Sequence, residues 1–391
     1  GQSQILPYII GLSKQQYLFY IISFEKRERF RENRKYIEDI CKQNKITWIP
    51  LSYTKKPPVF STIFDVFRLN KLVKKLLKTE KIDLIHCRSY ITSLIGLRYK
   101  KKRNIKFIFD MRGFWADERV DGNIWNLNNP IYKIVYTYFK KKEQLFFKKS
   151  DTIITLTEKA KSEILKLYPS ICNNKITVIP CATDFNKFNS EQLNSTMQIR
   201  EKLNINHHTF VLTYLGSLGT WYLLDEMMLF FSQLIKKYPD SVFLFISPEP
   251  FENIIKVAEK YSIDKGLIRH CFVRHDEIPQ YLSISNMGIM FIKPLYSKMS
   301  SSPTKFAEFL AMGIPVICND IGDLAEHVNQ IPQCICISSF SDKIFADAIN
   351  KLNLNQNYNP EIRNKAKEIY DLTTAIKTYS EVYKKIINEQ S

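Results

Sequence analysis

Short apolar segments alternate with amphipathic helical segments along the whole chain of 391 residues. The apolar segments are rich in β-branched and aromatic residues, and the stretches between them carry apolar residues every three or four positions. This alternation is typical of parallel α/β sheets, in which a helix follows each strand. The strands predicted for the first half are 18–23, 46–50, 82–86, 105–110, 152–156 and 176–180. Those predicted for the second half are 210–215, 242–247, 271–273, 287–292 and 316–318.

The number and length of these segments predict two domains. A chain of this size with 45% hydrophobic residues can bury two ordinary cores. We expect a first Rossmann-like domain over 1–187, a second over 205–368 and a final helix within 369–391 that returns to the first domain. The polar, asparagine-rich segment that ends near residue 208 is the expected linker.

The opening segment reads as a helix, with Ile5, Tyr8, Ile9 and Leu12 on one side. A Rossmann-like domain normally opens with a strand, and none precedes this helix. We therefore expect that a short segment with the first strand belongs upstream of Gly1.

The segment 301–317 reads as a short helix followed at once by a buried strand. Ser302 is a suitable N-cap residue, and Pro303 suits the first helical position. Gly313 is able to end the helix in a left-handed conformation, and Pro315 prevents its return.

A helix of this kind presents free backbone amides and a positive dipole end to an anion. The amides of Thr304 and Lys305 point to one place, with the Lys305 ammonium nearby. Glu308 lies one turn further, where its carboxylate is able to accept hydrogen bonds from a sugar diol attached to a bound phosphate. Together these residues indicate a site for a nucleotide diphosphate.

The run 301–317 resembles the donor-site motif of retaining glycosyltransferases of family 4, which have the GT-B fold. The resemblance implies two Rossmann-like domains that face each other across a cleft, with a C-terminal helix that crosses back to the first domain. It assigns Glu308 to the nucleotide ribose and the helix start, Ser302 to Lys305, to the donor diphosphate. The family often has a second Glu eight residues earlier, where this chain has Ser300, so the usual carboxylate contact to the donor hexose is missing.

A second donor-binding loop is expected at 214–222, between a strand and a helix. Gly216 and Gly219 permit close approach of the backbone to a ligand, although two glycines also occur in plain tight turns. The resemblance implies an Arg and a Lys in this loop, but Ser217 and Tyr222 occupy about those places. The cations that remain for the diphosphate are Arg274, Lys293, Lys298 and Lys305, of which we favour the two that flank the helix start.

The first domain carries its candidate residues in 108–119, directly after a predicted strand, where open α/β sheets bind ligands. The resemblance places Asp110 and Arg112 near the reacting centre, so we assign them catalytic roles together with Lys298. Aromatic, basic and acidic side chains in one loop also suit a sugar, although a surface loop with local ion pairs is the alternative. The predicted acceptor-binding residues are His86, Arg88, Trp115, Asp117 and Glu118, and His86 has the alternative of a purely structural role.

The net positive charge of the chain comes entirely from its first half. Residues 1–190 hold 37 Lys and Arg against 17 Asp and Glu, whereas the remainder holds 20 against 22. Such a surface attracts nucleic acid, anionic lipid or phosphorylated substrates. The segments 99–103 and 132–149 mix aromatic residues with lysines, and we expect them to dock on an anionic membrane. The alternative is that their aromatic side chains pack on the sheet and leave the lysines in solvent.

Several chemistries have no motif in this sequence. It contains no D-x-D, H-E-x-x-H, G-x-x-x-x-G-K or G-x-S-x-G pattern, and its eight cysteines form no C-x-x-C pair. We therefore expect no bound metal and no cofactor, and reduced cysteines. No apolar stretch approaches the roughly 20 residues that span a bilayer, and the opening is not a signal peptide. The expected location is the cytoplasm, peripheral on the inner face of the cell membrane.

The predicted function is the transfer of a sugar, with retention, from a UDP- or GDP-linked donor to a glycan or lipid-linked oligosaccharide, in surface polysaccharide biosynthesis. Two alternatives share the architecture: a non-hydrolysing sugar-nucleotide epimerase and a non-catalytic relative. A nucleic-acid-binding protein would explain the charge, but no known binding module is present, and we expect no nucleic acid partner.

Overall fold

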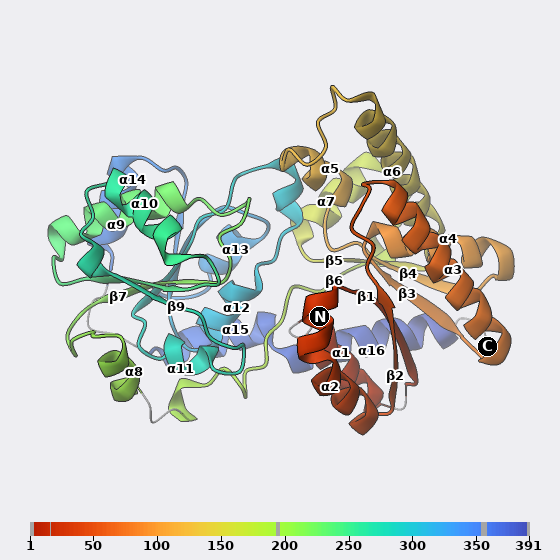
Figure 1. Ribbon diagram of the computed structural model, residues 1–391, viewed down its shortest axis with the longest axis horizontal. Coiled ribbons are helices and arrows are strands. Elements are labelled where there is room, and N and C mark those ends of the chain that lie inside the picture. Colours follow the sequence, from red (N-terminus) through yellow and green to blue (C-terminus); the bar gives the residue numbers. More distant parts are fainter. Residues whose placement is uncertain (1–3, 16, 193–195, 353–357, 389–391) are drawn as a thin grey trace.

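The computed structural model describes residues 4–15, 17–192, 196–352 and 358–388. The chain forms two α/β units that lie side by side, the first coloured red to yellow and the second green to blue (Figure 1). Each unit is built on parallel strands with helices packed against them. The predicted α/β class with two Rossmann-like domains is confirmed.

The first unit contains a four-stranded parallel sheet in the order β3-β4-β5-β6 and a separate parallel pair, β1-β2. Its strands are β1 (Phe19–Glu25), β2 (Ile46–Ser52), β3 (Leu84–Arg88), β4 (Lys106–Asp110), β5 (Thr152–Thr155) and β6 (Ile176–Val178). Its helices are α1 (Leu6–Ser13), α2 (Arg27–Gln43), α3 (Phe60–Thr79), α4 (Tyr90–Arg103), α5 (Trp115–Asp121), α6 (Pro130–Lys149) and α7 (Glu158–Leu167).

The second unit contains a six-stranded parallel sheet in the order β12-β11-β10-β7-β8-β9. Its strands are β7 (Val211–Leu215), β8 (Val242–Ile246), β9 (Ile268–Cys271), β10 (Met287–Met290), β11 (Val316–Asn319) and β12 (Ile335–Ile337). The helices from the linker onward are α8 (Thr196–Lys202), α9 (Leu224–Lys237), α10 (Phe251–Lys260), α11 (Ile278–Leu282), α12 (Thr304–Ala311), α13 (Leu324–Val328), α14 (Asp342–Asn350), α15 (Pro360–Tyr370) and α16 (Leu372–Asn388).

Two strands of the second unit differ from the prediction. The strand expected at 271–273 is β9, which ends at Cys271 because the chain turns outward there and leaves Phe272 72% exposed. The edge strand β12 was not predicted, since it has only three residues and offers almost no alternation to detect.

Helix α16 crosses from the second unit back to the first, as the GT-B resemblance implied (Figure 1). Tyr379 and Tyr383 on this helix are buried against α1 and the four-stranded sheet. The Tyr379 ring meets the Tyr8 ring edge-on at 5.6 Å between centroids. The predicted opening helix is α1, whereas the strand expected ahead of it lies outside the described residues.

The segments predicted to dock on a membrane bury most of their aromatic residues. Tyr99 on α4 and Phe139, Phe146 and Phe147 on α6 are all below 8% exposed and pack on the first unit's sheet and helices. For these residues the alternative interpretation, in which the aromatic side chains pack on the sheet, was right. Within the described residues, no helix is long and apolar enough to cross a membrane.

Candidate active site

Helix α12 begins at Thr304, and its N-terminus faces the first unit. Pro303 is the N-cap residue, and no side chain caps the helix. The prediction that Ser302 would cap it was wrong, because the Ser302 hydroxyl accepts a hydrogen bond from the Cys181 amide of the first unit at 3.1 Å. The first amides of any α-helix lack a carbonyl partner, so those of Thr304 and Lys305 are available to an anion.

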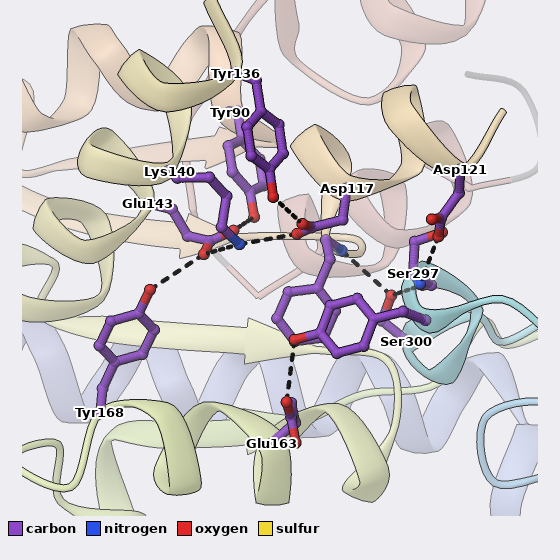
Figure 2. Close-up of polar contacts among 12 residues, drawn as sticks. Tyr90, Asp117, Asp121, Tyr136, Lys140, Glu143, Glu163, Tyr168, Ser297 and Ser300 are labelled. Carbon is purple, nitrogen blue, oxygen red and sulfur yellow. Dashed lines mark hydrogen bonds and ion pairs between the residues drawn. The ribbon is translucent and has the colours of Figure 1, made fainter. Parts of the chain in front are cut away.

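The 3₁₀ turn that precedes α12, η4 (Tyr296–Ser300), is held against the first unit by several hydrogen bonds. Figure 2 shows the Ser297 amide bonded to Asp121 and the Ser300 hydroxyl in the same group of contacts. Ser300 Oγ accepts from the Phe114 amide at 3.3 Å and donates to the Ser297 carbonyl at 2.7 Å. These contacts fix the path of the chain into the helix start.

Gly113 permits this close approach between the units. A Cβ atom at Gly113 would lie 3.0 Å from Ser300 Oγ, and its φ of 149° lies in the region that favours glycine.

Two cavities meet at the start of α12. The first has a volume of about 160 Å³ and contains Glu308, His275 and Lys187 among its lining residues. The second has about 260 Å³, and Arg112, Glu118 and Trp221 contribute to its lining. Thr304 lines both cavities. The positive end of the helix therefore lies between two spaces, each of which is formed by both units.

The first cavity places a carboxylate beside a histidine and a lysine. Glu308 is 5% exposed, and its Oε1 lies 3.1 Å from His275 Nε2. Lys187 Nζ lies 3.1 Å from His275 Nδ1, and burial lowers the pKa of this lysine. His275 thus connects the carboxylate to a cation that comes from the segment between the units.

Lys305 points away from both cavities, under the loop after β7. Its Nζ donates to the Tyr214 hydroxyl at 2.9 Å and lies 3.6 Å from the centre of the Tyr222 ring. Burial lowers the pKa of Lys305 well below its usual value, against the smaller opposing effect of Glu308. Its backbone amide faces the helix start, but its ammonium group lines neither cavity.

The second cavity contains a lysine that is already paired with a carboxylate. Lys298 Nζ donates to Glu118 Oε1 at 2.8 Å and lies 3.6 Å from the centre of the Trp221 ring. Arg112 lines the same cavity, with 17% of its side chain exposed and the Cys181 sulfur 3.0 Å from its Nη2. Arg112 also forms an ion pair with the buried Asp110, at 3.9 Å between Nη1 and Oδ1, which is longer than the contact between Lys298 and Glu118.

Asp110 and His86 lie together, but beneath α16. His86 Nε2 lies 3.4 Å from Asp110 Oδ2, which also accepts from the Tyr379 hydroxyl at 3.3 Å. Burial alone would raise the pKa of Asp110, but Arg112 and His86 outweigh it, so the pKa lies below its usual value. Asp110 is 1% exposed and lines neither cavity, so the structure does not bring it to the cleft as expected.

Two predicted acceptor-binding residues, Arg88 and Trp115, serve the first unit's own packing. Arg88 donates to the Gln4 carbonyl. The Trp115 ring packs on the rings of Trp125 and Phe139 at 5.2 and 4.9 Å. None of these side chains lines a cavity.

Asp117 joins a polar network under α5, drawn in Figure 2. It accepts from the Tyr136 hydroxyl and from Lys140, each at 2.8 Å, and Lys140 also binds the buried Glu143. Asp117 is therefore held by α6 and lies outside both cavities.

Four predicted donor-binding residues of the second unit also lie outside both cavities: Gly216, Ser217, Gly219 and Arg274. Arg274 is 78% exposed in its side chain and pairs with Asp276 in its own loop. Gly216 and Gly219 have positive φ angles of 94° and 51°, yet neither they nor Ser217 line a cavity. Gly216 instead leaves room for Lys305, whose Nζ would lie 3.4 Å from an added Cβ.

The lining residues that sequence reasoning did not assign to the site include Lys187 and His275 in the first cavity and Trp221 and Tyr222 in the second. His275 lies in the 272–279 loop after β9, and Lys187 lies three positions after Asp184, within the predicted domain boundary. For His275 and Lys187, the sequence indicated a segment near the cleft but not which side chain of that segment would reach it.

Two Rossmann-like units that face each other, a helix start between them and a returning C-terminal helix define a protein of the GT-B class. The chain belongs to the group 1 glycosyltransferases. Residues 9–187 match the family model described as Glycosyltransferase Family 4, and residues 195–369 match the one described as Glycosyl transferases group 1.

Known proteins with similar sequence or structure agree with this assignment. The chain is 26% identical over 271 residues to the UDP-Gal:alpha-D-GlcNAc-diphosphoundecaprenol alpha-1,3-galactosyltransferase of Escherichia coli. That match covers 67% of this chain and 63% of the relative, which is less than two thirds of the relative's length.

Two solved structures share the fold over nearly the whole chain. The glycosyltransferase from Rickettsia africae superposes with a TM-score of 0.69 at 16% identity, covering 97% of this chain and 94% of that one. Anabaena HepE in complex with UDP and glucose superposes with a TM-score of 0.67 at 12% identity, covering 97% and 95%.

Proposed function

We propose that this protein transfers a sugar, with retention of configuration, from a UDP- or GDP-linked donor to a glycan or lipid-linked acceptor in surface polysaccharide biosynthesis. The observation that carries the proposal is that Thr304, at the start of α12, lines both cavities. A diphosphate at the helix start would then have a nucleoside on one side and a sugar on the other. The names of the Escherichia coli relative and of the Anabaena complex support UDP as the nucleotide.

In this proposal the first cavity takes the nucleoside. The Glu308 carboxylate accepts hydrogen bonds from the two ribose hydroxyls, and His275 orients that carboxylate from its other side. The open amides of Thr304 and Lys305 bind the diphosphate. Arg112 adds positive charge from the first unit, where it faces the second cavity.

The second cavity takes the transferred sugar and the acceptor hydroxyl. Glu118 is the one carboxylate among the described residues that line this cavity, and Lys298 holds it in place. Transfer with retention needs no protein nucleophile here. The leaving diphosphate takes the proton of the acceptor hydroxyl on the same face of the sugar, while the helix start and Arg112 stabilise its developing charge.

The acceptor is proposed to be a lipid-linked oligosaccharide, with the protein in the cytoplasm on the inner face of the cell membrane. The excess of basic residues in the first half supports a phosphate-bearing acceptor and an anionic surface. The Escherichia coli relative is named for a diphosphoundecaprenol-linked acceptor.

Thermal unfolding in the presence of UDP, GDP and a panel of UDP- and GDP-sugars tests the donor assignment. A ligand at 100 times its dissociation constant should stabilise the fold by about 2.7 kcal/mol. A stabilising nucleotide sugar is then incubated with polyprenyl-diphosphate-linked sugars, and NMR of the product reports the anomeric configuration. Failure of every nucleotide to stabilise the protein would refute the proposal, and conversion of the free sugar nucleotide without acceptor would show an epimerase instead.

A further inference from the structure

The exposed face of α3 carries four large apolar side chains in a row. Phe60, Ile63, Phe64 and Phe67 are 70, 61, 53 and 64% exposed. Their spacing of three and four residues places them on one side of the helix. Isolated exposed apolar residues are ordinary, but a contiguous group of this size marks a binding surface.

Lysines continue the same face along the second half of the helix. The exposed positions that follow Phe67 at helical spacing are Lys71, Lys74, Lys75 and Lys78. Between residues 55 and 78 the chain has seven basic residues and a single acid, Asp65. Asp65 is buried and accepts hydrogen bonds from Thr54, so it does not reduce the charge of the exposed face.

The opposite face of α3 is packed against the rest of the first unit, so the exposed apolar side chains belong to a well-anchored helix. Leu69 and Val73 are buried against Ile95 and Tyr99 of α4. Helix α4 lies alongside α3 (Figure 1) and adds exposed basic residues of its own, Arg98 and 101–103. Neither helix lines the two cavities, which leaves this surface separate from the candidate active site.

We propose that this face of α3 docks on an anionic bilayer, with Phe60, Ile63, Phe64 and Phe67 entering the headgroup level and the four lysines bound to lipid phosphates. Aromatic side chains favour the headgroup region, and clustered lysines bind anionic lipid. Self-association through the same face is the alternative, and parallel pairing of two α3 helices would bring their rows of lysines together. The proposal rests on the proposed function only in that a lipid-linked acceptor makes membrane docking useful.

Co-sedimentation with phosphatidylglycerol–phosphatidylcholine vesicles tests the proposal, with no donor or acceptor present. The double variant F64S/F67S should lower the vesicle affinity at least tenfold, since both side chains are exposed in the free protein. The control L18S/F272S makes the same kind of change at side chains that are 80 and 72% exposed elsewhere, and it should bind as the wild type does. Equal affinity of F64S/F67S and wild type, or loss of binding only in the α6 variant I131S/I134S, would overturn the assignment.

A second pair of variants tests the lysines. Each basic residue near an anionic surface contributes about 1 kcal/mol, which is about fivefold in affinity. The variant K71E/K74E/K75E should therefore lose binding at low salt, whereas K236E/K256E/K343E, with the same change in net charge on the second unit, should retain most of it. Equal losses in the two triple variants would show that only net charge matters and would overturn the role of α3.

Two further measurements separate this proposal from its alternatives. Analytical ultracentrifugation without vesicles should give the same mass for wild type and F64S/F67S, and a wild-type dimer that the variant dissociates would assign the face to self-association. Transfer to a water-soluble acceptor should be unchanged in F64S/F67S. Absence of transfer in every variant would refute the proposed function and leave the vesicle result standing.

Discussion

Replacement of Glu308 by alanine removes the carboxylate that lines the first cavity one turn into α12. In the proposed complex this carboxylate accepts hydrogen bonds from two ribose hydroxyls. A hydrogen bond to a charged group contributes about 1.5–3 kcal/mol. Loss of both should cost about 3–5 kcal/mol of binding free energy, which is roughly a 100- to 3,000-fold weaker affinity at about 1.4 kcal/mol per tenfold.

The fold should tolerate this change. Among the described residues, the Glu308 side chain has one hydrogen-bond partner, His275. The His275 side chain is 36% exposed, so solvent screens the pair and its contribution to stability is small. Alanine also has the highest helix propensity. The melting temperature of Glu308→Ala should therefore stay close to that of the wild type.

Calorimetric titration with the nucleotide that stabilises the wild type measures the effect directly. Glu308→Gln serves as the matched control, because it keeps the shape and one acceptor oxygen and should lose less affinity than the alanine variant. Unchanged nucleotide affinity in a folded Glu308→Ala protein would refute the ribose assignment, and with it the orientation of the donor across the two cavities.

Three further predictions concern the metal, the packing at Gly322 and pH. Transfer should continue in excess EDTA, because the α12 start and Arg112 supply the positive charge; loss that Mn²⁺ or Mg²⁺ restores would contradict this. Gly322→Ala should lower the free energy of unfolding by about 1–3 kcal/mol in urea titrations, since the added Cβ would lie 2.3 Å from the Ser301 carbonyl oxygen at a φ of 53°; an unchanged midpoint would argue against that packing. Burial lowers the pKa of His327, so the folded protein favours the neutral imidazole. The contribution of this histidine to the free energy of unfolding is complete above its usual pKa of 6.5 and is lost as the pH falls through the pKa in the folded state. His327→Gln should therefore flatten the decline in stability between about pH 7 and about pH 5, and a slope equal to that of the wild type would exclude this histidine as its source.

Most of the strands and the α12 segment could be predicted from the sequence because local patterns determine them. The run from Val316 to Cys318 is apolar throughout, and Gly313 does end the helix with a positive φ of 69°. Side-chain partners across the cleft could not be predicted from the sequence. Nothing near Ser302 in the sequence indicates that the Cys181 amide donates a hydrogen bond to the Ser302 hydroxyl. Nothing near Asp110 indicates that Tyr379 of α16 covers the Asp110 carboxylate.

Predictions based on charge were wrong where burial determines the position of a charged side chain. Lys305 follows the helix start in sequence, yet the aromatic rings of Tyr214 and Tyr222 draw its long side chain under the neighbouring loop. Lys298 was expected to be available to phosphate, yet Glu118 of the first unit neutralises it. The exposed apolar face of α3 was not predicted, because apolar residues at helical spacing look the same in a sequence whether they are buried or face solvent.

The return of α16 to the first unit has a consequence for synthesis on the ribosome. Ala182 and Ala375 belong to one buried cluster, so the first unit cannot complete its core until roughly 200 further residues have been translated. At about 5–20 residues per second that delay lasts roughly 10–40 s, during which the apolar surface around Tyr8 and Ile108 stays open. The nascent chain should therefore be a chaperone client for that period, and its second unit should mature before the first.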